Sequence, residues 1–360
     1  MQIIGSYKDA IQKILEAGAQ APSGDNSQPW KFKISNNTVF VYNIPDRDNP
    51  ILNIHQSGSY VAHGGLVENI AIAAEAMGYE SIITPFPDGD DKDVTARIKL
   101  TPAMPAQNSL FTAIWDRHTN RKRYQEKFLT ESQRDEILNM PTEMGLESAV
   151  RMILIEDKEK RIIVGKAVAS IEKVILENQN LHRLLFKDVV WDDKEEKREC
   201  AGLYINTMEF NALQKLLFRF ARHWKLMKIG IAIGFPKLIV NDDSKKYASG
   251  AAIVIATMKD NSPLSYFTAG RVFQRSWLNI TSWGLALQPI TALFFAKQRL
   301  LSGDVSTFSS EHAKIIEENY EIVRDIFGVG QETIAMLGRI GYSAPASARS
   351  SRKDPVITFV

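Results

Sequence analysis

Hydrophobic positions along the chain recur in two periods, which predict two kinds of element. A spacing of three or four residues predicts helices over 8–21, 59–79, 131–140, 157–177, 268–284 and 311–327. Alternating or short continuous apolar runs predict strands over 31–34, 38–42, 81–87, 96–100, 150–156, 251–256 and 334–340. The stretch 194–228, rich in charged and bulky apolar residues, is also expected to be helical. Helices and strands therefore occur in both halves of the chain.

One helical pattern occurs twice. Residues 63–78 align without a gap on residues 269–284, and two glycines of each segment coincide: Gly64 with Gly270, and Gly78 with Gly284. Self-similarity of this kind favours a duplicated fold. Chance similarity between two amphipathic helices is the alternative.

The proline-containing stretch 101–107 reads as a linker between two units. The first unit is expected to span residues 1–107 and the second residues 108–360. A chain of 360 residues has room for two domains of ordinary size.

Composition narrows the function classes. Lys and Arg number 44 and Asp and Glu 42, so the net charge of +2 gives no electrostatic case for a nucleic-acid binder. The single cysteine, Cys200, excludes a disulfide within the chain. The first ten residues lack the pattern of a signal peptide, and no run of 18 apolar residues occurs. We therefore expect a cytoplasmic protein with neither a nucleic-acid nor a membrane partner.

Several common catalytic patterns are absent. The six histidines form no His-x-x-x-His or Glu-x-x-His pair, so no metal site is expected. The chain has no Gly-x-Ser-x-Gly elbow and no Walker A loop. Gly328 and Gly330 lack the third glycine of a dinucleotide-binding turn, and this segment reads better as a helix C-cap.

The loop 21–30, Ala-Pro-Ser-Gly-Asp-Asn-Ser-Gln-Pro-Trp, is one of two segments that suggest chemistry. Its proline and serine put backbone amides and hydroxyls in a tight turn after a helix. The amides of Asn26 and Gln28 can pair with a planar heterocycle that carries donors and acceptors. A plain helix-to-strand connector is the alternative, and Trp30 is expected to pack in the core.

The second such segment is 116–124, Asp-Arg-His-Thr-Asn-Arg-Lys-Arg-Tyr. Four basic side chains, a histidine and a hydroxyl so close together suit a phosphate, which favours arginine forks and hydroxyl donors. A solvated run of charges is the alternative. Arg349, Arg352 and Lys353 supply a second basic set near the end of the sequence.

Both segments resemble motifs of the nitroreductase superfamily. The loop 21–30 is similar to that family's flavin loop, and residues 117–121 are similar to its phosphate motif. Trp283-Gly284-Leu285, Pro289-Ile290-Thr291 and 337–342 resemble further family segments. The resemblance implies an α+β fold, with a mixed, mostly antiparallel sheet packed with helices and two related halves fused in one chain. The order of the motifs is similar to that in the fused, twin branch of the family.

The resemblance also implies a cofactor, FMN, with NAD(P)H as the electron donor. The residues it assigns to FMN are Pro22, Ser23, Gly24, Asn26, Arg117, His118, Thr119, Arg121, Pro289, Thr291, Arg349 and Arg352. The phosphate is expected at Arg117, His118, Thr119 and the tail arginines, the flavin N1/O2 edge at Arg121, and flavin N5 at the amide of Thr291. Flavin N5 itself would carry the chemistry, so no catalytic side chain is expected.

The implied function is reduction of nitroaromatic, quinone or similar conjugated acceptors by ping-pong hydride transfer. The stretch 190–236 is expected to be a helical lid, which suggests an alternative, an FMN-storing protein with little turnover. A third possibility is an α/β protein that binds another phosphate ligand. Only one Ala-Pro-Ser loop and one phosphate motif occur, so one complete site per chain is expected, in a monomer that mimics a dimer or in a homodimer.

Three positions depart from the family pattern. Gly24 stands where many relatives have a second serine, Ala292 replaces a frequent glycine, and the segment from Tyr342 differs from the usual Gly-Tyr-Pro. The first departure puts one hydroxyl contact in doubt, and the second could crowd the flavin face.

Overall fold

The computed structural model describes residues 7–87, 91–304 and 306–360. Its first 116 residues form α1 (Tyr7–Ala19), η1 (Gly24–Asn26), β1 (Trp30–Ser35), β2 (Thr38–Asn43), η2 (Pro45–Arg47), η3 (Ile54–Gln56), α2 (Ser57–Ala76), β3 (Tyr79–Pro85), β4 (Val94–Pro102) and α3 (Ser109–Asp116). The middle of the chain forms α4 (Glu131–Glu143), β5 (Val150–Ile155), α5 (Lys158–Glu177), α6 (Gln179–Lys187), β6 (Val189–Val190), α7 (Asp193–Glu199), β7 (Leu203–Tyr204), η4 (Ile205–Met208), α8 (Ala212–Ala221), α9 (Trp224–Ala232) and α10 (Phe235–Ala248). The last part forms β8 (Ala252–Met258), α11 (Pro263–Ser282), β9 (Ala286–Pro289), α12 (Ala292–Leu301), α13 (Ser310–Phe327), β10 (Thr333–Gly341) and β11 (Ile357–Phe359).

The first sheet has the order β11-β1-β2-β4-β3, and only the β11–β1 pairing is parallel. Side chains of β1 alternate, with Trp30, Phe32 and Ile34 buried and the two lysines between them exposed. This alternation lets one face pack on α1 and α2 while the other faces water. Trp30 therefore lies in the core, as predicted.

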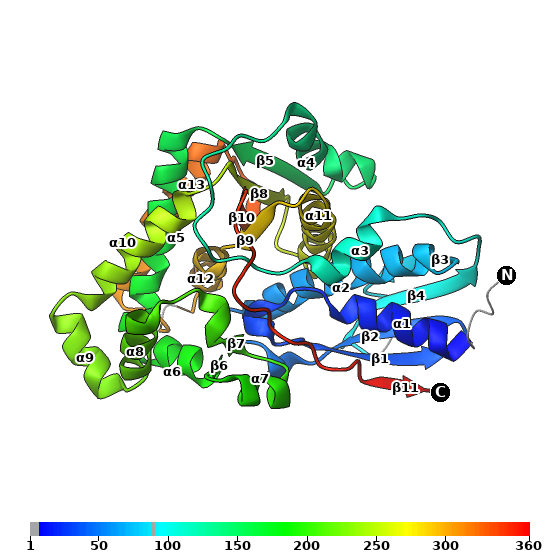
Figure 1. The fold of residues 1–360 in the computed structure, drawn as a ribbon, viewed down its shortest axis with the longest axis horizontal. Helices are drawn as coiled ribbons and strands as arrows, with labels where there is room; N and C mark the ends of the chain where they lie inside the picture. Colours follow the sequence, from blue (N-terminus) through cyan, green and yellow to red (C-terminus); the bar gives the residue numbers. More distant parts are fainter. Residues whose placement is uncertain (1–6, 88–90, 305) are drawn as a thin grey trace.

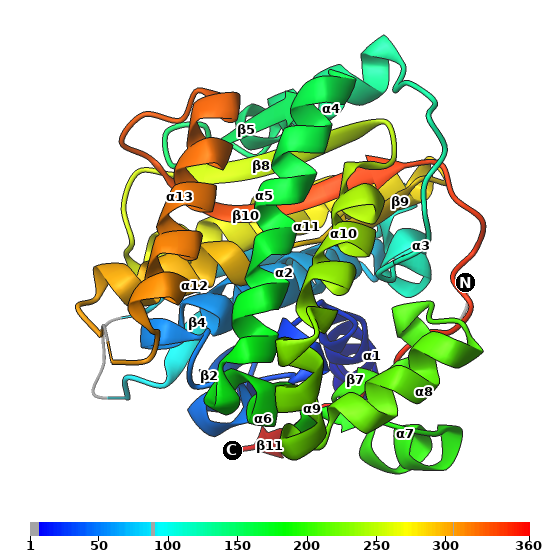
Figure 2. The same cartoon turned by 90° about the vertical axis from the view of Figure 1, so that its left-hand side faces the viewer.

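The second sheet, β5-β8-β10-β9, is antiparallel throughout and buried on both faces. Ile253 and Ile255 of β8 pack with residues of α5 and α13, whereas Ala252 and Val254 pack with residues of α11. Figure 2 shows α5 and α13 lying across one face of this sheet. Double burial explains why β8 is a continuous apolar run. The two sheets with their helices confirm the predicted α+β fold.

Helices α2 and α11 cross at the glycines that the repeat aligns. A Cβ atom on Gly64 would lie 2.0 Å from the carbonyl oxygen of Phe267, and one on Gly270 would lie 2.1 Å from that of Val61. Gly64 thus faces Phe267, three positions before Gly270, and Gly270 faces Val61, three positions before Gly64. This reciprocal contact joins the two layers, and glycine is required because backbone approaches backbone.

The tail of the chain returns to the first sheet. After β10 it crosses the molecule, and β11 pairs in parallel with β1, with Phe32 opposite Ile357. Residues beyond 108 therefore complete a sheet built from residues before 107. Strand β11 was not predicted, because it has three residues and follows a basic, proline-containing stretch.

The predicted elements agree with the observed ones to within a few residues, with one main correction. The stretch 194–228 is not continuously helical, because Cys200, Gly202 and Glu209 adopt positive φ and end or interrupt helices. Short elements α3, α6, α12 and β9 were also missed. Among residues 7–87, 91–304 and 306–360, no helix is both long enough and apolar enough to span a bilayer.

We predict that Gly64→Ala lowers the free energy of unfolding by at least about 2 kcal/mol, because its methyl group would meet the Phe267 carbonyl and force α2 from α11. Gly65→Ala is the matched control, since its methyl group would only touch the side chain of Gln274 at 3.5 Å. Urea denaturation of both variants measures the difference. Equal stabilities would contradict a close crossing at Gly64.

Candidate functional site

The loop after α1 holds an unusual backbone conformation. Asp25, Asn26 and Gln28 have φ values of 44°, 58° and 51°, a region that Asp and Asn tolerate better than most residues. The hydroxyl of Ser23 accepts a hydrogen bond from the Gln28 amide at 2.9 Å, and the ring Nε2 of buried His63 lies 2.9 Å from the Pro29 carbonyl. The loop is therefore held by a hydrogen bond between two of its own residues and by a contact from α2.

The same loop is tied to two distant segments. The side chain of Gln28 donates to the Cys200 carbonyl at 2.7 Å and accepts from the Lys353 amide at 2.9 Å. Asn26 donates to the Ser351 carbonyl at 3.0 Å, while its own Oδ1 is buried without a partner in the described structure. Gln28, expected to pair with a heterocycle, instead contacts the tail and the stretch 190–236, which we call the insert. Asn26 retains one free acceptor.

Arg117 lies at the C-terminal end of α3 and is 2% exposed. Its Nη2 donates to the Gln20 carbonyl at 2.6 Å, and its guanidinium lies 4.6 Å from the ring centroid of Trp277. Its Nε is buried and has no hydrogen-bond partner in the described structure. The stacking on Trp277 fixes the plane of the guanidinium and leaves that donor available.

Two tail arginines join Arg117. Arg349 donates from Nη2 to the Arg117 carbonyl at 3.1 Å. Arg352 donates to the Ser351 carbonyl at 3.2 Å, and its Nε is likewise buried without a partner in the part of the chain described. Folding thus gathers the basic motif and the basic tail, 232 residues apart for Arg117 and Arg349.

Repulsion among the three arginines makes their protonated, positively charged forms less favourable. Burial, and then repulsion from Arg352 and Arg349, lowers the pKa of Arg117. Burial and repulsion from Arg349 lower the pKa of Arg352 to about 10, with partial compensation from Glu196. No ion pair joins any of the three to a carboxylate among the described residues. Such a cluster is stabilised by an anion.

A cavity, which we call the arginine cavity, lies at this cluster. Its lining combines the loop, the basic motif, the insert and the tail: Pro22, Ser23, Asp25, Asn26, Arg117, His118, Thr119, Arg121, Gly202, Leu203, Thr207, Ala348, Arg349, Ser350 and Arg352. All five residues expected at a phosphate line it. His118 Nδ1 lies 2.7 Å from the Asp116 carbonyl, which directs the ring.

Two further cavities adjoin the arginine cavity. An interhelix cavity shares Pro22, Ser23 and Asp25 with it and extends between α2 and α11. An apolar cavity shares Arg121 with it and extends under α8 and α10.

The structure divides the remaining expected residues between these cavities. Gly24, Pro289 and Thr291 line the interhelix cavity, where Ala292 also lies. Arg121 instead stands between the arginine and apolar cavities, and its Nη1 donates to the carbonyl and hydroxyl of Thr207 at 3.3 Å. Of the expected residues, only Pro22 and Ser23 border both the arginine cavity and the interhelix cavity. Strand β9 lies at the junction, because Gln288 lines the apolar cavity and Pro289 the interhelix cavity.

Sequence reasoning missed two acidic residues at this junction. Asp25 lies in the loop itself, and burial, then repulsion from Asp188, raises its pKa. Asp48 lies beside Gly24, where a Cβ would approach its Oδ1 to 3.1 Å, so Asp48 borders the space that a serine side chain at 24 would need. Asp48 belongs to no motif, and only the fold brings it to the loop.

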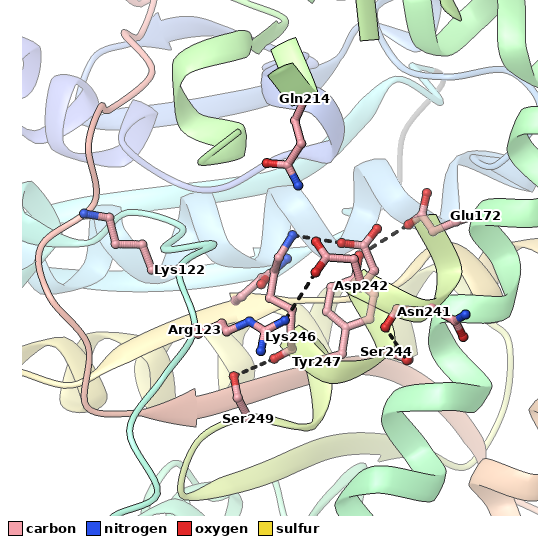
Figure 3. A network of polar contacts seen from close by, with 12 residues as sticks. Lys122, Arg123, Glu172, Gln214, Asn241, Asp242, Ser244, Lys246, Tyr247 and Ser249 are labelled. Atoms are coloured by element: carbon pink, nitrogen blue, oxygen red, sulfur yellow. Dashed lines mark hydrogen bonds and ion pairs between the residues drawn. The ribbon is translucent and has the colours of Figure 1, made fainter. Parts of the chain in front are cut away.

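The polar end of the apolar cavity is a network on α5 and α10 (Figure 3). Tyr247 donates to Glu172 at 3.3 Å, and Lys246 pairs with Asp243 at 2.9 Å. Burial, followed by repulsion from Asp243, raises the pKa of Glu172. Among the described residues, no group of three or more His, Cys, Asp or Glu side chains could hold a metal ion.

We predict that Asp48→Asn stabilises the protein near pH 8 but has little effect near pH 4. Burial is the main cause that raises the pKa of Asp48 to about 6, and repulsion from Asp25 adds to it. The folded carboxyl keeps its proton after the unfolded one, with a pKa of about 3.9, has lost it, so wild-type stability falls as pH rises between these values. A shift of about two units corresponds to at most roughly 3 kcal/mol.

Urea unfolding of the wild type and Asp48→Asn from acid to mildly alkaline pH tests this expectation. An asparagine can still accept from the Asn49 amide and meet the Ser59 hydroxyl, as Asp48 does at 2.7 and 3.1 Å. If the stability curves of the two proteins run parallel, the pKa of Asp48 is not raised in the folded state, and the prediction is wrong.

Comparison with known proteins provides evidence that is independent of the geometry of the site. No protein-family model matches the chain. Two proteins of Mycobacterium tuberculosis with names beginning "Putative NAD(P)H nitroreductase" are similar to it: Rv3131 is 25% identical over 118 residues, and acg is 28% identical over 97 residues. These matches cover 32% and 26% of this chain and 34% and 29% of those relatives, so they span about a third of the relatives' length.

Among solved structures, the FMN-dependent nitroreductase NfnB from Mycobacterium smegmatis, in complex with NADPH, is 12% identical, with a TM-score of 0.37 over 68% of this chain and 94% of that chain. The sequence matches agree with the motifs that the fold gathers at the arginine cavity. The chain is therefore similar, over about a third of its length, to proteins described as putative NAD(P)H nitroreductases.

Proposed function

We propose that this protein is an FMN-dependent NAD(P)H oxidoreductase. The observation that carries the proposal is the group of three arginines at the loop 21–30, with two buried Nε donors lacking a partner in the described structure. A phosphate has the charge to offset these cations and the oxygens to accept from these donors. The relatives are described as putative NAD(P)H nitroreductases, and the loop and the basic motif resemble the flavin-binding motifs of the nitroreductase superfamily, so FMN is the phosphate compound to test.

The residues present fit FMN. Arg117, Arg352 and, from the rim, Arg349 would hold its phosphate, together with His118 and Thr119. Pro22, Ser23 and Asn26 would close over the middle of the molecule. The ring would lie against the end of β9, where the apolar and interhelix cavities adjoin and where Pro289 and Thr291 are found.

FMN, when bound, supplies the chemistry: it accepts a hydride from NAD(P)H and passes two electrons to an acceptor. The protein's residues would then act by position and charge. Arg121, at the boundary of two cavities, would place a cation near the ring and stabilise negative charge there. The backbone amide of Thr291 would face flavin N5. Nitroaromatic compounds and quinones are the acceptor classes to test.

A second candidate, an FMN-storing protein, is favoured by the insert. Gly202, Leu203 and Thr207 line the arginine cavity, and Thr207 accepts two hydrogen bonds from Arg121. This cover would slow exchange of ligands at the site. The two candidates differ in one observable: under anaerobic conditions NADPH should bleach the flavin absorption of the oxidoreductase rapidly, whereas the flavin of a storage protein should persist.

We also propose that the chain is a fused pair of halves with one complete site. The repeat, and the reciprocal contact of Gly64 and Gly270, support two related halves that face each other. The site combines loop 21–30 of the first half with the basic motif and tail of the second. One FMN per chain is the expected stoichiometry.

We predict that Arg352→Gln weakens FMN binding at least tenfold, because a charge-assisted hydrogen bond contributes about 1.5–3 kcal/mol. The same change should not destabilise the flavin-free protein, since it removes a cation that is repelled by the neighbouring arginines. FMN titration and thermal unfolding of the flavin-free form measure the two effects. Loss of stability without loss of affinity would show a purely structural arginine.

Arg123→Gln is the matched control. Arg123 belongs to the same basic motif but pairs with Asp242 at 3.2 Å, and the arginine cavity is lined without it. FMN affinity should be unchanged in this variant. A loss as large as that of Arg352→Gln would mean that general positive charge, rather than the cavity, binds the cofactor.

A further inference from the structure

The insert presents an unusual outer surface. Eight of the 22 exposed large hydrophobic side chains of the described residues lie within 213–238, on α8, α9 and the start of α10. Ile229 and Ile233 are 61% and 79% exposed. Figure 1 shows α8 and α9 at a corner of the molecule, away from both termini. We call this the insert face. Apolar side chains gathered in this way mark an interaction surface.

The charged side chains of the insert face are all positive. Residues 210–241 contain six Lys or Arg and no Asp or Glu, in a chain whose two kinds of charge almost balance. None of these six cations forms an ion pair among the described residues. The next acids along α10, Asp242 and Asp243, are paired with Arg123 and Lys246. The face is therefore both apolar and cationic.

We propose that the insert face docks on a membrane surface containing anionic lipids. A helix with exposed Leu, Ile and Phe among Lys and Arg can lie in the interface, with its apolar groups below the headgroups and its cations beside the phosphates. A second copy of this chain is a poorer occupant, because identical cationic faces repel. Docking needs no spanning helix, so it is compatible with the absence of one from the described residues.

The apolar cavity opens toward this face. Leu217 and Leu238 line the cavity and are 43% and 66% exposed, so its wall reaches the surface that would meet the bilayer. Arg121, which also lines the arginine cavity, lines the apolar cavity too. Resting on the proposed function, the acceptor is then a lipophilic compound such as a prenyl quinone. Its reduction to the quinol would take a hydride, which comes from NAD(P)H, and one proton from water, and would release NAD(P)⁺; FMN, if held as proposed, would supply the chemistry of the transfer.

Vesicle sedimentation tests the docking. Wild-type protein should sediment with vesicles of phosphatidylcholine and phosphatidylglycerol, less with phosphatidylcholine alone, and less at high salt. The double variant Ile229→Glu/Ile233→Glu should reduce binding at least about tenfold, because it removes apolar contact and adds repulsion. Ile82→Glu is the control, since Ile82 is 54% exposed on β3, far from the insert.

Several results would overturn the proposal. These are failure of the folded wild type to bind anionic vesicles, equal loss in the control, or light scattering that shows the insert face buried in a homodimer. A vesicle-inert protein that instead captures an acidic protein through this face would also overturn it.

Reduction assays separate this proposal from the function on which it rests. The double variant should lose reduction of a prenyl quinone held in vesicles but keep reduction of a short, water-soluble quinone. Equal reduction of both by the variant would refute delivery from the membrane. If the wild type reduces neither quinone, the proposed oxidoreductase function is wrong. Vesicle binding would then still test the proposed docking.

Discussion

Burial of like charge is the constraint on which the site depends. Arg117, Arg349 and Arg352 meet where a loop from one end of the chain, a motif from its middle and the tail converge. The burial of Arg117 and Arg352 and the repulsion from Arg349 at the rim cost stability that hydrogen bonds to backbone carbonyls offset only in part. Such an arrangement persists because the surrounding fold holds it, through the Trp277 ring below Arg117 and the Gln28 contacts to tail and insert. It is preorganised for an anion.

Two features of the fold bring these three segments together. The crossing of α2 and α11 brings the two sheet layers together at glycines, and the pairing of β11 with β1 returns the tail to the first sheet. The insert completes the wall with Thr207, while its outer helices carry apolar and cationic groups away from the site. One segment thus has two surfaces, one toward the proposed cofactor and one toward a proposed membrane.

Local pattern predicted most of this molecule. Long helices and strands follow from periodicity, and the loop and basic motif were identified because turn formers and clustered arginines are visible in sequence. What could not be predicted depends on distant contacts. Asp48 reaches the loop only through folding, Gln28 is engaged by residues 172 and 325 positions away, and β11 exists only because β1 offers an edge. Arg121 was assigned by analogy, and Thr207 of the insert, rather than its own neighbours, determines where it points.

The central claim is that the arginine cavity binds the phosphate of a flavin. Comparing the affinities of the flavin-free protein for FMN and for riboflavin, which differ only in that phosphate, tests it most directly. Charge-assisted contacts from at least two arginines should make FMN bind at least about a hundredfold more tightly. Equal affinities for the two flavins, or no binding of either, would contradict the account.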